Sequence, residues 1–270
     1  MRELLITDLR RIIKDKLFLV ACILGVVFAA STPLLYKGLS LLIGVDNELI
    51  GSFANAKSIF FSSFVLGSNF GFVLPILLAI VLCKDFSHGT VRNKIICGKS
   101  RTKIFLAMFF AGTIVICAAM LVHALITLGI SLCFFSYQAE PFTSDTLLYA
   151  LISTLFSLLI YVFVSAIISL LSVCMKNAGF AVLLYIGINF FFSIIGTVIS
   201  VAAVFIDQTD KFLTKLFEIL QKVNLFTAAY IGTGTSYSAT DVLCVLAPVI
   251  IGTALALFLG ISIFRKKDIK

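Results

Sequence analysis

Six long apolar stretches alternate with shorter polar ones along the chain. Each is long enough for an α-helix to cross a hydrocarbon layer about 30 Å thick, which takes about 20 residues. Because the stretches are continuously apolar, they predict helices and not the alternating strands of a barrel. The predicted fold is an all-α integral membrane protein with a single transmembrane domain over residues 1–270. We place the spans at about residues 17–36, 59–83, 104–136, 147–175, 178–206 and 240–264.

Two segments outside these spans have the pattern of amphipathic helices. In residues 1–16 aliphatic side chains share one helical face and Arg and Lys take much of the rest, which predicts a helix lying in the membrane interface. The aliphatic positions are Leu5, Leu9, Ile12 and Ile13. Residues 207–239 contain a second helix, which we expect half-buried at the outer surface as an amphipathic or re-entrant segment. Its apolar positions are Phe212, Leu216, Ile219, Leu220 and Val223, and its charged ones are Lys211, Lys215, Glu218 and Lys222.

Composition and charge distribution agree with this pattern. Hydrophobic residues make up 61% of the chain and charged residues 13%, whereas about a quarter of a soluble domain is charged. The predicted spans leave 16 of the 21 Lys and Arg on the side of both chain ends and of residues 84–103. Because cations favour the cytoplasmic side, both termini are predicted to be cytoplasmic. The net charge of +8 is explained by topology, so no nucleic acid partner is expected.

The stretch Lys84–Lys103 is the most informative part of the sequence. It contains six Lys and Arg and one carboxylate, Asp85, between two spans, so it is predicted to face the cytoplasm. Its interior predicts a short helix that begins around His88–Gly89–Thr90 and ends at Gly98. We expect Val91, Ile95 and Ile96 to share one face of it. A short, basic, half-apolar helix of this kind is typical of a docking element.

The order of residues in this loop also matches a known pattern. Asp85-Phe86-x-x-Gly89-Thr90-x-Arg92-Asn93, followed by Gly98-x-Ser100-Arg101-x-Lys103, resembles the first cytoplasmic loop of ABC-transporter permeases of the type-2 export class. Members often have Glu at the position of Asp85. The resemblance implies a coupling helix that sits in a groove of a partner ATPase. The contact residues it implies are Asp85, Phe86, His88, Gly89, Thr90, Val91, Arg92, Ile95, Gly98 and Arg101. An ordinary positive-inside loop would explain the charges, but not the order of the other residues.

The resemblance extends to the whole assembly. It implies two permease copies, probable homodimer partners, and two ABC ATPase subunits in a bacterial plasma membrane. ATP and Mg²⁺ would bind to the ATPase, so this chain would be neither an enzyme nor a cofactor carrier. Gly98-Lys99-Ser100 looks like the end of a phosphate-binding loop, but Asn93 stands where that motif needs glycine. The seven cysteines form no CxxC pair, so neither disulfides nor a metal site are indicated.

The cargo is predicted to be hydrophobic or amphipathic. The chain has 27 Phe and no Trp, and its spans contain practically no charges. The small size and apolar spans most resemble bacterial exporters of antimicrobial or toxin peptides. Possible pathway-lining residues are Ser68, Asn69 and Asn189. The other interpretation is that serine hydroxyls in the second span bond their own backbone and that Asn69 pairs with a neighbouring helix. Pro75 is expected to kink this span.

Three other functions are compatible with a membrane protein of this size. A non-transporting membrane anchor or regulator of an ATPase remains an alternative. An intramembrane enzyme is disfavoured, because His123 has no carboxylate partner in a span and paired acids are absent; a helix–helix hydrogen bond is the favoured role for His123. A secondary transporter is disfavoured because the spans lack charges.

Overall fold

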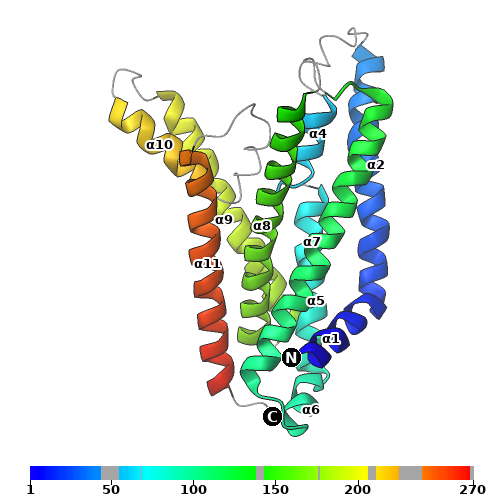
Figure 1. Ribbon diagram of the computed structural model, residues 1–270, viewed down its shortest axis with the longest axis vertical. Coiled ribbons are helices and arrows are strands. Elements are labelled where there is room, and N and C mark those ends of the chain that lie inside the picture. The colour runs from blue at the N-terminus through cyan, green and yellow to red at the C-terminus, as the bar shows by residue number, and fades with distance from the viewer. Residues whose placement is uncertain are drawn as a thin grey trace.

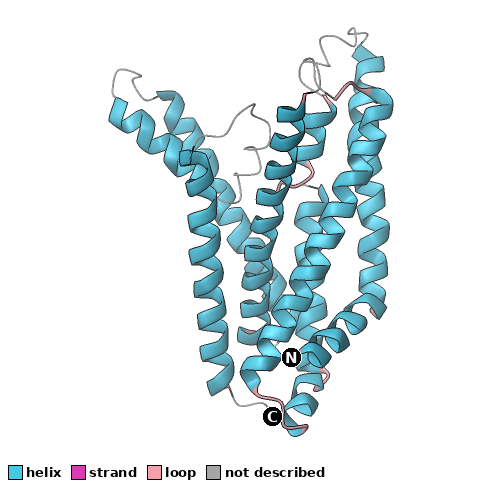
Figure 2. Cartoon of the chain, in the orientation of Figure 1, coloured by secondary structure: helices cyan, strands magenta, loops and turns pink. Residues whose placement is uncertain are grey.

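The computed structural model describes residues 1–43, 55–67, 69–137, 143–175, 177–205, 211–224 and 239–267. Within these residues all regular structure is helical (Figure 2), which confirms the all-α prediction. The helices are α1 (Arg2–Lys14), α2 (Lys16–Ile43), α4 (Ala56–Ser62), α5 (Asn69–Ser87), α6 (Thr90–Ile96), α7 (Arg101–Phe134), α8 (Ser144–Cys174), α9 (Ala178–Phe205), α10 (Lys211–Val223) and α11 (Ala239–Lys266).

Six helices of the described residues are long and apolar enough to cross a membrane, as predicted: α2, α5, α7, α8, α9 and α11. The first is longer than expected. α2 continues through Ile43, seven residues beyond the predicted end of the first span at about residue 36. Leu39, Leu41 and Leu42 keep this part of the helix apolar on its exposed side. α7 has 34 residues and is therefore about 51 Å long at 1.5 Å per residue, well beyond the hydrocarbon layer.

The predicted second span is interrupted. Instead of one helix over residues 59–83, the chain forms α4, a non-helical turn over residues 63–67, and then α5. Pro75 lies inside α5, so the interruption comes before it. Two side chains from other helices bond the carbonyl groups that the interruption frees. The Tyr161 hydroxyl donates to the Phe64 carbonyl at 3.1 Å, and the Asn189 amide donates to the Leu66 carbonyl at 3.2 Å.

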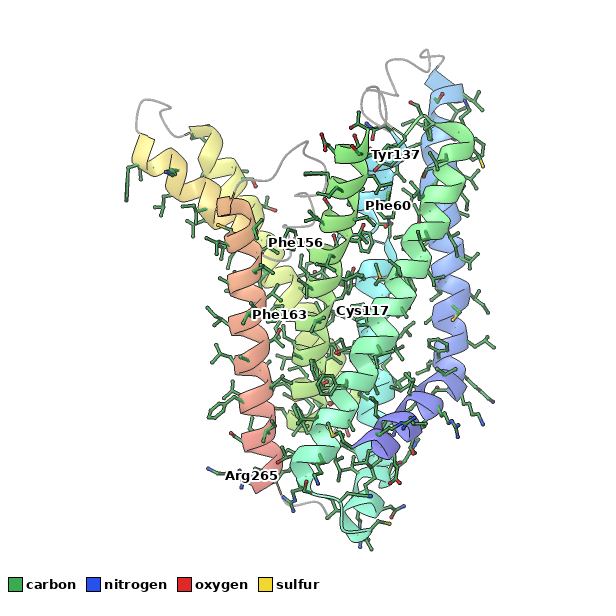
Figure 3. The ribbon with its side chains drawn as sticks, viewed as in Figure 1. Phe60, Cys117, Tyr137, Phe156, Phe163 and Arg265 are labelled. Carbon is green, nitrogen blue, oxygen red and sulfur yellow. The ribbon has the colours of Figure 1, made fainter. Side chains whose placement is uncertain are left out.

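The core of the bundle lies between α5, α7 and α8. In the most apolar stretch of each of these helices, half or more of the residues are buried within the protein. Large aromatic side chains fill it, and Phe61, Phe70, Phe105 and Tyr161 are almost fully buried. α11 packs against α8 and α7. A side chain at Gly260 would collide with the Phe105 ring, so glycine is what lets α11 approach so closely. α8 carries Phe163 where α11 passes (Figure 3), beside Gly252.

The helices give the molecule two distinct ends (Figure 1). α1, α6 and the end of α11 lie together at one end, which we call the α6 end. α4, α10 and the start of α8 lie at the opposite one, the α10 end. Figure 3 places Arg265 at the α6 end, and Phe60 and Tyr137 toward the other. All six long helices run between these ends, which agrees with the predicted alternation of spans.

Candidate functional site

α6 is a seven-residue helix delimited by two glycines in left-handed conformation. Gly89 has φ of 69° and precedes the helix, and Gly98 has φ of 77° and follows it. Residues other than glycine rarely adopt such angles, because the Cβ atom comes too close to the backbone. A Cβ atom at either position would meet nothing else within 4 Å. The glycines are thus required by backbone conformation and not by space, and the predicted start and end of the helix are confirmed.

The two sides of α6 have different surroundings. Val91 is 1% exposed, while Ile96 is 72% exposed and Ile95 is half-buried. The prediction that all three share one face is therefore wrong. Five residues turn a helix by about 140° at 100° per residue, which moves Ile96 away from Val91. One side of α6 anchors it to the rest of the chain, and the other presents Ile96 and Arg92 outward.

Buried ion pairs join α1 to α5 and α6. Lys94 of α6 pairs with Asp8 of α1, whose side chain is 1% exposed. Arg11 of α1 pairs with Asp85 of α5, which is also buried. Asp8 lies on the buried side of α1 with Leu4 and Ile12, a side for which the sequence pattern predicts aliphatic residues alone.

Two more ion pairs extend this connection toward solvent. Lys84 contacts both carboxylate oxygens of Asp15, at 3.0 and 2.9 Å. Lys99 lies 3.5 Å from Glu3, whose side chain is 88% exposed. The first pair joins the residue between α1 and α2 to α5, and the second joins the segment after α6 to the start of α1. Four ion pairs thus join residues 3–15 to the stretch Lys84–Lys103, three of them from α1 and one from Asp15.

Burial and pairing act in opposite directions on these charges. Burial lowers the pKa of Lys94, and the negative charge of Asp8 counteracts it. Burial likewise lowers the pKa of Arg11, against the influence of Asp8 and Asp15. For Asp15, burial raises the pKa, but the Leu17 amide and the Lys84 ammonium together hold the pKa below its usual value. A buried charge is tolerated in such a place only when it has a partner, so each carboxylate and its cation depend on one another.

Arg101, at the start of α7, holds the end of α11. Its guanidinium donates to the backbone carbonyls of Phe264, Arg265 and Lys267, at 3.2, 2.8 and 2.7 Å. These carbonyls belong to the last turn of α11 and to the residue just after it, where the helix itself cannot supply donors. Phe86 packs edge-on against Phe264, with ring centroids 5.9 Å apart. The stretch Lys84–Lys103 is thus held against the end of α11.

The predicted contact residues fall into two groups. Asp85, Phe86, Val91 and Arg101 have partners within this chain, as described above. His88, Arg92 and Gly98 are exposed, whereas Gly89, Thr90 and Ile95 are partly covered. Ile96 is the most exposed aliphatic side chain of this segment and was not among the predicted contacts. Ile96 lies five residues after Val91, and on a helix of 3.6 residues per turn this spacing alone would have indicated that the two side chains lie on different faces.

Two of the predicted pathway residues, Asn69 and Asn189, make hydrogen bonds within the bundle. Asn69, with φ of 48°, donates to the Thr32 hydroxyl of α2 at 3.3 Å, which confirms pairing with a neighbouring helix. Asn189 is 3% exposed and holds the interruption between α4 and α5. Ser68 lies outside the described residues. The Ser62 and Ser63 hydroxyls bond their own helix backbone, as the other interpretation expected.

His123 also has the predicted helix–helix contact. Its Nδ1 lies 2.9 Å from the Gly25 carbonyl of α2. Since a carbonyl can only accept, Nδ1 is the donor. The described part of the chain contains no cluster of three or more His, Cys, Asp or Glu suited to a metal ion.

Comparison with known proteins places the chain in a family without assigning an activity. None of the curated proteins matches it. The model of the family described as "Protein of unknown function (DUF2705)" matches residues 18–270. The matched region contains α6 and nearly all of the six long helices, while α1 precedes it. The chain belongs to the DUF2705 family.

Proposed function

We propose that this chain is the membrane-spanning permease subunit of an ATP-driven exporter of the ABC type-2 export class, and that α6 is its coupling helix. The observation that carries the proposal is the two-sided character of α6. One side is anchored by Val91 and Lys94, and the other presents Ile96 and Arg92 outward, with the exposed His88 just before the helix. An exposed aliphatic side chain provides affinity at a docking surface, and flanking charges set its register.

The connections of α6 are suited to transmitting force. A coupling element moves spans only if it is firmly joined to them. α6 follows α5 directly, is paired with α1 through Lys94 and Asp8, and leads into α7, whose Arg101 holds the end of α11. A loop that only sets topology would need exposed cations, not carboxylates buried against them. This favours a mechanical role for the loop over a purely topological one.

The proposed assembly contains a second copy of the permease and two ABC ATPase subunits, which bind ATP and Mg²⁺. α9 and α11 are little covered within one chain, because only 17% of the residues in the most apolar stretch of each helix are buried. Phe190, Ile194 and Val198 of α9 are among the exposed side chains, so a second copy or lipid can cover them. The cargo is a hydrophobic or amphipathic molecule, with antimicrobial or toxin peptides as the first class to test.

The key experiment compares Ile96→Asp with Ser87→Asp. Both place a new negative charge at the α6 end on an exposed residue, but only the first removes the exposed aliphatic side chain. The permease is co-expressed with an ABC ATPase from the same genome, purified, and placed in lipid nanodiscs. Ile96→Asp is expected to weaken ATPase association by about tenfold, the effect of losing a central apolar contact. Ser87→Asp is expected to bind nearly as well as the wild type.

ATP hydrolysis and transport are measured on the same samples. Substrate-stimulated hydrolysis that is lost in Ile96→Asp and kept in Ser87→Asp would support coupling through α6. Equal association and transport in both variants and the wild type would contradict it. Association without any transport in the wild type would instead identify a membrane anchor of the ATPase.

The proposed location is the bacterial plasma membrane, with both termini and the α6 end in the cytoplasm. Cys97 is exposed beside α6, and Lys215 is exposed on α10. In a chain whose only cysteine is Cys97, a membrane-impermeant thiol reagent added to intact cells should give no labelling. Lys215→Cys in a background without the native cysteines should be labelled. The reverse pattern would place α6 outside and exclude contact with a cytoplasmic ATPase.

A further inference from the structure

A cavity of about 310 Å³ lies where α1 meets α2 and α7. Its walls are made by small side chains of α2, including Ala21, Cys22 and Gly25, and by Ala118 and Ala119 of α7. Leu9 and Ile13 of α1 close it toward the α6 end. An apolar cavity of this size is not expected to hold ordered water, which needs several polar partners, but it accepts apolar molecules.

The cavity lining is almost entirely apolar. His123 contributes to the wall, and its Nδ1 donates to the Gly25 carbonyl. This bond satisfies the carbonyl of a glycine that faces the cavity. A ligand there is therefore held by apolar contacts along its length, and not by a set of converging hydrogen bonds.

The cavity communicates with the surface that faces lipid. Val26 is 52% exposed, Ile114 45% and Val122 56%, and all three belong to its lining. They lie on α2 and α7, two helices that are long and apolar enough to cross the membrane. A molecule dissolved in the bilayer can enter sideways between these helices without crossing water.

Free cations stand beside the closed end of the cavity. Arg10 and Lys14 adjoin the lining residues Leu9 and Ile13 in the sequence of α1, and both are exposed. Neither has an ion partner among the described residues, in contrast to Arg11 on the same helix, which pairs with Asp85. The cations of α1 that face the protein are neutralised by its own carboxylates, and those that face outward are not.

We propose that this cavity binds one acyl chain of an anionic phospholipid whose phosphate lies against Arg10 and Lys14. An apolar slot open to the bilayer and a cationic rim at the level of the headgroups match the two parts of such a lipid. The bound chain fills the space between α1, α2 and α7 and holds α1 in place. The site depends on insertion in a membrane and is independent of any ATPase.

The test uses a unique fluorescent reporter, because the chain has no Trp. Val26→Trp places one at the cavity. Phe258→Trp places the control on the lipid-facing side of α11, where Phe258 is 68% exposed. Each reporter is compared with itself in the two lipids, so the comparison does not require the two positions to lie at the same depth. Each full-length variant is reconstituted with acyl-brominated phosphatidylglycerol or acyl-brominated phosphatidylcholine, which quench Trp on contact.

Phosphatidylglycerol is expected to quench Val26→Trp at about fivefold or more lower mole fraction than phosphatidylcholine, while Phe258→Trp shows no preference. Arg10→Gln and Lys14→Gln should each reduce the preference about fivefold, the effect of one cation near an anionic surface. Lys103→Gln, which removes an exposed cation of α7 at the same end, should leave it unchanged. Equal quenching by both lipids at Val26→Trp would overturn the proposal.

Filling the cavity provides an independent arm. Cys22→Phe, on an exposed lining residue, should reduce quenching of the Val26→Trp reporter by phosphatidylglycerol. Val20→Phe, on an exposed α2 residue outside the lining, should not. If Val26→Trp does not fold, Val122→Trp reports from the α7 wall. Quenching unaffected by Cys22→Phe would mean that lipid contacts the surface only and that the cavity does not hold an acyl chain.

Discussion

α1 and α10 are amphipathic helices of 13 residues each, but they meet the rest of the chain in different ways. α1 buries Leu4, Asp8 and Ile12 and has ion pairs to α5 and α6. α10 packs on α9 and α11, yet several of its apolar side chains remain exposed. Phe212 is 74% exposed, and Leu216 39%.

The difference lies in what completes the apolar side of each helix. The protein itself covers Leu4, Asp8 and Ile12 of α1, and charge pairs define the position of the helix. α10 leaves its apolar side to the surroundings, as does a helix half-immersed in a membrane surface. The same amphipathic pattern thus serves as a structural link at one end and as a surface element at the other. Four substitutions test this comparison.

The largest effect is expected for Asp8→Leu. This change leaves the buried Lys94 ammonium without a partner, which should lower the free energy of unfolding by about 3–5 kcal/mol. Unfolding is followed in detergent micelles by denaturant titration. The double variant Asp8→Leu/Lys94→Met should recover most of the loss. Glu3→Gln, on the exposed pair of the same helix, should change little. Wild-type stability in Asp8→Leu would mean that α1 is not fastened by this pair.

On α10, Leu216→Asp is expected to cost about 1–2 kcal/mol, less than a charge at the bilayer centre because α10 lies near the end of the bundle. The measurement is the yield of folded protein in membranes and its unfolding midpoint. Lys215→Gln is the matched control on the adjacent exposed residue and should behave as the wild type. Equal tolerance of both changes would remove the distinction between the two sides of α10.

Asn224→Ala tests how α10 is attached. Asn224 follows α10 and is 7% exposed, and its amide donates to the Phe192 carbonyl of α9 at 2.8 Å. Loss of this bond should cost about 1 kcal/mol and speed hydrogen exchange in α10. Thr7→Ala is the counterpart on α1, where the exposed hydroxyl only bonds its own helix. If exchange in α10 is unchanged, packing alone holds the helix.

The smallest effect should come from Asp15→Asn and depend on pH. The pKa of Asp15 is lower in the folded protein than its usual value, so folding favours the ionised carboxylate. Its stabilising contribution is therefore present above about pH 4 and is lost as the pH falls through the folded pKa. In acid, the free energy of unfolding of the wild type should fall slightly as Asp15 becomes protonated. Asp15→Asn lacks this contribution at every pH, so its free energy of unfolding should not show that part of the fall. Parallel pH profiles for the two proteins would show that the Lys84 pair contributes nothing.

Local features were predictable from sequence. The six spans, the limits of α6 at Gly89 and Gly98, and the helix at α10 all follow from periodicity or from glycine conformation, which involve residues close together in the chain. A charged residue at Lys37 favours a span that ends at residue 36, but apolar residues continue after it and α2 extends through Ile43.

Features that join distant residues were not predictable. The turn between α4 and α5 is stabilised by Tyr161 and Asn189, which lie 97 and 123 residues from the carbonyls they bond. Likewise, Asp8 sits 86 residues from Lys94. One sequence pattern of charges cannot distinguish a cation that pairs with a distant carboxylate from one that faces lipid headgroups.

The sequence by itself determined that this is an all-helical chain with six membrane-length helices, because hydrophobic length and backbone propensity are local properties. It also placed a short helix between two glycines in a basic loop. Only the tertiary structure decided which side of that helix is anchored, that the second span is interrupted, and that α1 is bound through buried charges. Those outcomes depend on which side chains meet across the bundle, and burial makes the presence or absence of a partner decisive for every polar group.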